Sequence, residues 1–126
     1  MKVSVTGDVP ETAELTPLER EVLKAALASA GTGLVSLSEQ LDLLEVASRT
    51  YSGVGFLTRL RLPPDAPLLQ GALASLPAVY AAHPDLSSPA EFLLEIKDGR
   101  LHCIEAFCFD GLWPRDEQGF RLRIAE

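Results

Sequence analysis

Glu105 is the side chain of this sequence whose chemistry depends most on where the fold places it. It lies in the run 100–109, and counting back from the preceding Asp-Gly turn puts its carboxylate on the apolar side of a strand, opposite Phe92. An unpaired buried carboxylate is costly, so we expect it to be hydrogen-bonded, protonated or placed at an opening of the core. Such a group is a candidate general base or ligand anchor. The alternative is a carboxylate at the edge of the sheet, or one that Tyr51, Thr58 or backbone amides satisfy.

Histidine and cysteine do not complete a catalytic group with Glu105. His102 lies three residues earlier on the same strand, so it leaves the opposite face, where it faces Glu95 as a cross-strand pair. Cys103 and Cys108 are five residues apart and also point to opposite faces, which prevents a disulfide between them. Neither thiol has a base placed to activate it, and packed thiols are the commoner case. No Cys/His cluster has metal-ligand spacing, so the sequence predicts no metal and no cofactor.

Two further motifs resemble ligand-binding elements. Gly53-Val54-Gly55 lacks the third glycine of a phosphate loop and opens a strand rather than a helix, so we discount it. Trp113, which precedes Pro114, fits a packing lid over the end of the sheet, the alternative being a residue that stacks on a ligand. With Tyr51 and Glu105, Trp113 would line a pocket between helices and sheet. That pocket is the basis of one hypothesis, a small-molecule binder or enzyme.

Four arginines alternate with apolar residues in two predicted strands. They are Arg59, Arg61, Arg121 and Arg123. If the two strands pair, the guanidinium groups form a basic stripe on the outer face, able to hold a carboxylate or a phosphate. An ordinary solvated face, neutralised by acids such as Glu91 and Glu95, is the simpler interpretation.

An acidic surface provides a second binding hypothesis. Glu39, Asp42 and Glu45 share one arc of a predicted helix with no base between them, and the net charge is −7. This charge repels nucleic-acid phosphates and anionic lipid, so we expect neither as a partner. It permits a basic protein, and the arc is the surface on which such a partner would bind. Most charge runs of this kind are only solvated faces.

The elements that position these side chains predict an α+β fold. Thr16 and Glu19 form a capping box around Pro17 at the start of a first helix. Ser36 and Glu39 mark the start of a second helix in the same way. The apolar stripe of the second helix carries it to about residue 48 and consists of Leu37, Leu41, Leu44 and Ala47.

Beyond the helices the hydrophobic period changes to that of strands. Strands are expected at 56–62, around 78–82, and at 92–97, 100–109 and 120–124. Asp98-Gly99 is the preferred sequence for a two-residue hairpin turn. We therefore expect two helices packed on one face of a mostly antiparallel sheet of about four to five strands. The hairpin register assigns a core face made of Phe92, Leu94, Ile96, Leu101, Cys103, Phe107 and Phe109.

Length and composition predict a single domain over residues 1–126. Of these residues 47% are hydrophobic and 23% charged, a balance typical of globular proteins. Residues 1–15 are expected to form a lead-in or an added edge strand, 16–48 the helices, and 49–126 the sheet. The sequence has no apolar run of the length of a signal peptide or a membrane span, which favours the cytoplasm.

Three segments resemble a group of small uncharacterised bacterial proteins. They are Tyr51-Ser-Gly-Val-Gly-Phe-Leu-Thr58, Asp98-Gly-Arg-Leu101, and Ile104-Glu-Ala-Phe107 running on to Trp113-Pro114. The resemblance covers roughly residues 49–114. It implies a shared α+β fold and a bacterial, cytosolic setting, and it brings no known activity or site residue.

These observations favour a non-catalytic binding module over an enzyme. The first hypothesis is an interaction module that neutralises a basic protein such as a toxin. The second is the small-molecule pocket around Glu105, Tyr51 and Trp113. The third is a homodimer whose interface is a sheet edge or the outer face of the sheet.

Overall fold

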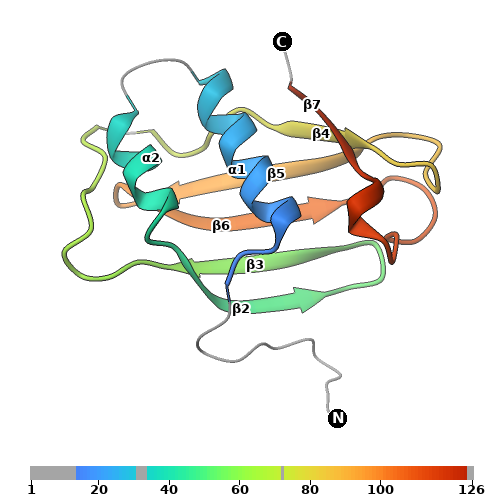
Figure 1. Cartoon of the computed structure of the whole chain (residues 1–126), viewed down its shortest axis with the longest axis horizontal. Helices are drawn as coiled ribbons and strands as arrows, with labels where there is room; N and C mark the ends of the chain where they lie inside the picture. The colour runs from blue at the N-terminus through green and yellow to red at the C-terminus, as the bar shows by residue number, and fades with distance from the viewer. Residues whose placement is uncertain (1–13, 31–33, 72, 125–126) are drawn as a thin grey trace.

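The residues that the structure describes form a six-stranded antiparallel sheet with two helices on one face. The computed structural model describes residues 14–30, 34–71 and 73–124, so most of the expected lead-in or edge strand at residues 1–15 lies outside it. The described elements are α1 (Pro17–Ser29), α2 (Val35–Leu41), β2 (Glu45–Tyr51), β3 (Gly55–Arg61), β4 (Val79–Ala82), β5 (Ala90–Lys97), β6 (Arg100–Phe107), the 3₁₀ turn η1 (Glu117–Gly119) and β7 (Arg121–Ile124). The sheet order is β2-β3-β6-β5-β4-β7, with both helices in front of it in Figure 1. The predicted α+β fold is confirmed, with slightly more strands than expected.

Helix α1 begins as its sequence predicts. The Thr16 hydroxyl accepts a hydrogen bond from the Glu19 N–H (3.1 Å), and the Glu19 carboxylate accepts one from the Thr16 N–H (2.9 Å). The capping box and Pro17 at the first turn are both confirmed. The apolar stripe around Val22 and Leu23 is fully buried against the sheet. No helix in the described part of the chain is long and apolar enough to cross a membrane.

Helix α2 differs from its prediction at both ends. Leu34, not Ser36, precedes the helix and makes no side-chain cap, and the helix ends at Leu41. Residues expected in its last turns form β2 instead, so Ala47 is exposed beside a bulge in that strand. The sequence 45–51 is rich in strand-favouring residues, and pairing with β3 outweighs its helical spacing.

The β5–β6 hairpin forms as predicted but contains a bulge. Asp98 and Gly99 have φ of 53° and 76°, as a type I′ turn requires. The predicted pairs next to the turn, such as Ile96 with Leu101, are confirmed. The register then shifts, so that Glu95 faces Cys103 and His102 is the extra residue. Because side chains alternate along a strand, every later β6 residue leaves the face opposite to the one predicted.

The core lies between the helices and the inner face of the sheet. Phe92, Leu94 and Ile96 of β5 are buried there as predicted, together with Leu101 of β6. Ile104 and Ala106 supply the rest of the β6 contribution. The prediction that Cys103, Phe107 and Phe109 line this core is wrong, because the bulge turns the β6 residues outward and Phe109 lies exposed beyond the strand.

Gln40 joins α2 to the hairpin. Its amide nitrogen donates to the carbonyls of Pro67 and Gly99 (both 2.8 Å). Its amide oxygen accepts from the Leu101 N–H (2.8 Å). The side chain is fully buried, so one residue of a short helix satisfies three backbone groups at the edge of the core.

Candidate functional site

A groove lies on the outer face of the sheet, beside β5. Residues 74–76 lie beside β5, on the same side as β4, and form an incomplete strand. In it the Leu76 N–H donates to Leu94 O (3.1 Å). Ser75 pairs with Glu95 and Val79 with Phe92, so four residue steps on this segment correspond to three on β5. The extra residue makes the segment depart from β5 around Pro77, which has no N–H to donate. The resulting groove has a volume of about 440 Å³.

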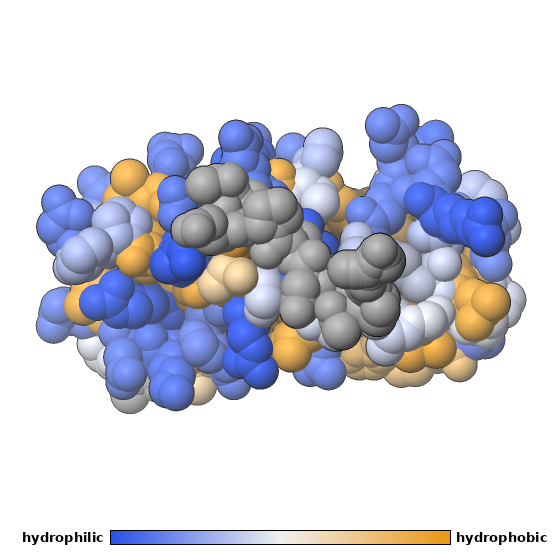
Figure 2. Space-filling view, turned by 90° about the horizontal axis from the view of Figure 1, so that it is seen from below, coloured by the Kyte–Doolittle hydropathy of each residue, from blue (hydrophilic) through white to orange (hydrophobic). Residues whose placement is uncertain are grey.

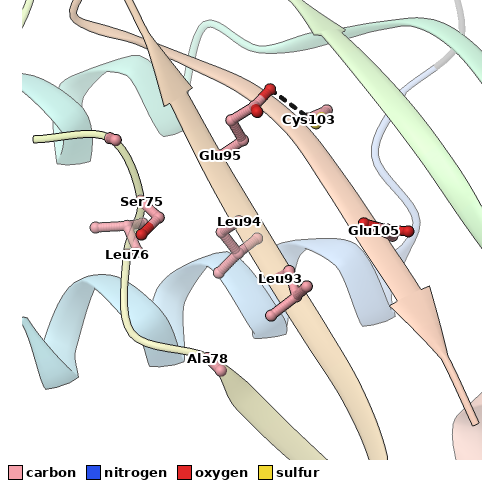
Figure 3. A pocket seen from close by; sticks show the side chains of 9 residues that line it. Ser75, Leu76, Ala78, Leu93, Leu94, Glu95, Cys103 and Glu105 are labelled. Carbon is pink, nitrogen blue, oxygen red and sulfur yellow. Dashed lines mark hydrogen bonds between the residues drawn. The ribbon is translucent and has the colours of Figure 1, made fainter.

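Leu93, Glu95, Cys103 and Glu105 line the groove from β5 and β6. Figure 3 shows the two carboxylates along these neighbouring strands, with the segment of Ser75, Leu76 and Ala78 on the other side of β5. Leu93 is 39% exposed and lies two residues from Glu95 on β5 and opposite Glu105 of β6. The groove therefore combines an exposed leucine with two carboxylates, and Arg59 of β3 lies opposite Cys103 on the same face.

The thiol in the groove is held in its protonated form. Cys103 Sγ donates to Glu95 Oε1 (3.4 Å), and His102 Nε2 lies 3.7 Å from the same oxygen. Burial, and then the hydrogen bond and the charge of Glu95, raise the pKa of Cys103 to about 11. Only a thiolate is a good nucleophile, so this arrangement disfavours nucleophilic catalysis at neutral pH.

Glu105 points away from the core, contrary to its prediction. It faces Leu93 of β5 and Leu57 of β3, and it is exposed. No described residue gives it a hydrogen bond or an ion pair. The predicted inward position is wrong because the bulge at His102 shifts the register by one residue. The argument for a buried general base at this position is lost with it.

Tyr51 and Trp113 come together at one end of the sheet, without Glu105. The Trp113 indole N–H donates to Glu117 Oε2 (2.9 Å), and the Tyr51 hydroxyl lies 3.4 Å from the same oxygen. Burial, and then the Glu117 carboxylate, raise the pKa of Tyr51 to about 12. The Trp113 ring packs edge-on against Phe56, at 5.5 Å between centroids, as a packing lid would. Because Phe56 belongs to the inner face and Glu105 to the outer face, the described residues do not form the predicted three-residue pocket.

The four arginines do not form one stripe. Arg59 and Arg61 lie on β3, whereas Arg121 and Arg123 lie on β7, four strand positions away. At about 4.8 Å per strand, this places the pairs about 19 Å apart. The condition for a basic stripe, that these two strands pair, is not met, because β6, β5 and β4 lie between them.

The predicted acidic arc is also divided by the fold. Glu39 lies on α2 and Asp42 just after it, both exposed, but Glu45 begins β2. Glu45 forms an ion pair with Arg61 of the adjacent strand, at 3.6 Å. The three carboxylates therefore do not share one helical surface.

A buried ion pair escaped the sequence analysis. Arg49 donates from Nε and Nη2 to the two oxygens of Glu19 (2.8 and 2.6 Å), and Thr58 Oγ1 donates to Glu19 Oε2 (2.5 Å). The Glu19 side chain is 0% exposed. Burial alone lowers the pKa of Arg49, but hydrogen bonding and attraction from Glu19 outweigh it, so the net pKa is raised. The available signal was the position of Glu19 beside the buried stripe of α1.

His83 is also structural, although the sequence suggests no partner for it. Its Nε2 lies 2.8 Å from Asp116 O, and its Nδ1 accepts from the Asp85 N–H (3.0 Å). The hydrogen bonds thus assign the proton to Nε2. The ring also packs edge-on against Phe120, at 4.8 Å between centroids. All of these contacts fix the loop after β4 rather than present a reactive group.

Neither metal chemistry nor a known relative indicates another site. Among the described residues no three His, Cys, Asp or Glu side chains gather so that they could hold a metal ion. Comparison with protein-family models, with curated proteins and with solved structures finds no match. The groove on the outer face is therefore the candidate binding site of the described residues.

Proposed function

We propose that this chain is a non-catalytic binding module that holds a basic segment of another protein over the groove of β5 and β6. The observation that carries the proposal is the exposed Leu93, which lies two residues from Glu95 on β5 and opposite Glu105 of β6. Both helices lie on the other face of the sheet, so no described helix covers this surface.

The chemistry of the groove selects the partner. Lysine and arginine combine an aliphatic stem with a cationic head, so the stem can lie on Leu93 while the head reaches a carboxylate. Glu105 is available for this role, since it has no ion pair with a described residue. The net charge of −7 favours encounter with a basic protein and disfavours nucleic acid.

The same residues argue against catalysis in the groove. The Cys103 proton is held by burial and by Glu95, so the thiol is a poor nucleophile. His102 lies beside Glu95, where an imidazole adds a hydrogen-bonding group to the rim. A recognition surface accounts for these side chains without a reaction.

A peptide binding experiment tests the proposal. The probe is a fluorescent nine-residue peptide of alternating lysine and leucine, measured by anisotropy at physiological salt. The variant Glu95→Gln/Glu105→Gln removes two charges from the groove, and Glu39→Gln/Asp42→Gln removes two from the α2 region as a matched control. Two exposed ion pairs contribute about 1–2 kcal/mol together, so the groove variant should bind about tenfold more weakly. The control should bind within about twofold of wild type.

Three results would contradict the proposal. The first is no binding of the peptide to the wild type at micromolar concentration. The second is equal weakening in both variants, which would indicate only a general charge effect. The third is loss of binding in the α2 variant alone, which would move the partner to the surface of Glu39 and Asp42.

A further inference from the structure

Three exposed apolar side chains project from one end of the sheet. Val54, Phe109 and Leu112 are 46%, 61% and 74% exposed, and we call them the apolar tip. They come from the β2–β3 turn and from the loop after β6. In Figure 1 these two segments lie at the right-hand end of the sheet, and Figure 2, which views the molecule from below, shows hydrophobic residues on the surface at that end as well as elsewhere. An exposed apolar group of this kind marks an interaction surface more often than a scattered single residue does.

The apolar tip is held in place by its backbone. Cys108 N–H donates to Val54 O and Trp113 N–H to Gly53 O, both at 2.8 Å, so both ends of the 109–112 loop are fastened to the β2–β3 turn. The Phe109 ring packs edge-on against Phe107, with 5.3 Å between centroids. A preorganised apolar group loses little conformational entropy on binding, which is the property of an interface anchor.

The apolar tip continues the surface of the groove. Phe107 lies on the outer face, opposite Glu91 of β5 and two residues beyond Glu105. From Cys103 to Phe109 the chain advances six residues, which is about 20 Å in extended conformation. A partner segment that reaches from groove to tip therefore needs about six extended residues.

We infer that the apolar tip anchors the same basic protein segment, which carries its cationic side chains at the groove and apolar side chains about six residues further on. This inference rests on the proposed function. The charges beside the tip select this occupant: Asp110 lies within the loop and Glu91 opposite Phe107, so anionic lipid is repelled. A second copy related by a two-fold axis would bring carboxylates against carboxylates.

Two peptides separate the groove from the tip. Both carry Lys-Leu-Lys at one end; one continues with four serines and then Leu-Phe, and the other with six serines. The wild type should bind the Leu-Phe peptide about tenfold more tightly, because the Leu-Phe end buries apolar side chains against the tip and the gain exceeds the cost of ordering them. Phe109→Ser/Leu112→Ser should bind both peptides equally. Val35→Ser/Leu43→Ser, which removes exposed apolar side chains from the α2 region, should keep the preference.

The outcomes distinguish failure of the tip from failure of the groove. If the tip variant keeps the preference for the Leu-Phe peptide, the inference is wrong and the groove stands. If neither peptide binds the wild type, the proposed function fails and the inference with it. Binding to phosphatidylserine vesicles, or a dimer in sedimentation velocity, that the tip variant abolishes would assign the tip to lipid or to a second copy and overturn the inference.

Discussion

Glu19, on the helix that packs against the inner face of the sheet, and Glu105, on the outer face, are the same residue type in opposite surroundings. On the inner face Glu19 is fully buried and accepts hydrogen bonds from Arg49, Thr58 and the Thr16 N–H. On the outer face Glu105 is exposed and has no such partner among the described residues. A carboxylate whose acceptors are all occupied holds elements together, whereas an exposed one without a partner can recognise another molecule.

The comparison is tested most strongly by replacing each glutamate with glutamine. Glu19→Gln leaves the Arg49 charge buried without a carboxylate, so the free energy of unfolding should fall by about 3–5 kcal/mol. Glu105→Gln should change it by less than about 0.5 kcal/mol, because the side chain is exposed. Urea denaturation followed by circular dichroism measures both. Equal effects of the two substitutions would show that the faces do not differ as described.

Gln40 extends the comparison to an uncharged group on the inner side. Gln40→Ala leaves the carbonyls of Pro67 and Gly99 and the Leu101 N–H without their partner. Each lost buried hydrogen bond costs about 1 kcal/mol, so we expect a destabilisation of about 2–4 kcal/mol in the same urea assay. Gln70→Ala, at an exposed position, is the control and should be near neutral. A loss below about 1 kcal/mol for Gln40→Ala would mean that water replaces the amide.

The smallest expected effect concerns the Cys103 thiol on the outer face. Its pKa of about 11 means that thiolate forms only as the pH rises through that value, so alkylation by iodoacetamide at pH 8.5 should be slow. Glu95→Gln removes the carboxylate that holds the proton and lowers the pKa towards the ordinary value, while burial still raises it. The alkylation rate should increase about three- to tenfold, as peptide mapping by mass spectrometry would measure.

Glu91→Gln is the matched control for the Cys103 experiment. Glu91 lies on the same strand and outer face as Glu95, but opposite Phe107 rather than Cys103. The substitution Glu91→Gln should leave the alkylation rate of Cys103 within about twofold of wild type. A similar acceleration by both substitutions would assign the effect to net charge rather than to the Glu95 hydrogen bond.

The sequence predicts best where the determining contacts are local. Thr16, Pro17 and Glu19 determine the start of α1 within four residues, and Asp98-Gly99 determines the hairpin turn. The bulge at His102 has no such signal, because alternation on either side of it is compatible with two registers. Glu105 was therefore assigned to the wrong face, although the strand that carries it was predicted correctly.

Other failures depended on distant partners. The separation of Arg59 from Arg121 follows from the strand order, which spacing along the chain does not determine. Residues 45–48 are compatible with a helix until β3 pairs with them. The groove was missed for the same reason, since it requires the segment around Pro77 to lie beside β5.

The capping box of α1 also has a consequence for the order of folding events. Glu19 reaches Thr16 across three residues, but Arg49 across 30 and Thr58 across 39. Loop closure costs more entropy as the loop lengthens, so we expect the local contact to form before the distant ones, which require the β2–β3 hairpin. In that order, the start of the helix orients the carboxylate before Arg49 and Thr58 reach it. The Glu19 side chain thus both caps its own helix and forms the tertiary contact that joins this helix to β2 and β3.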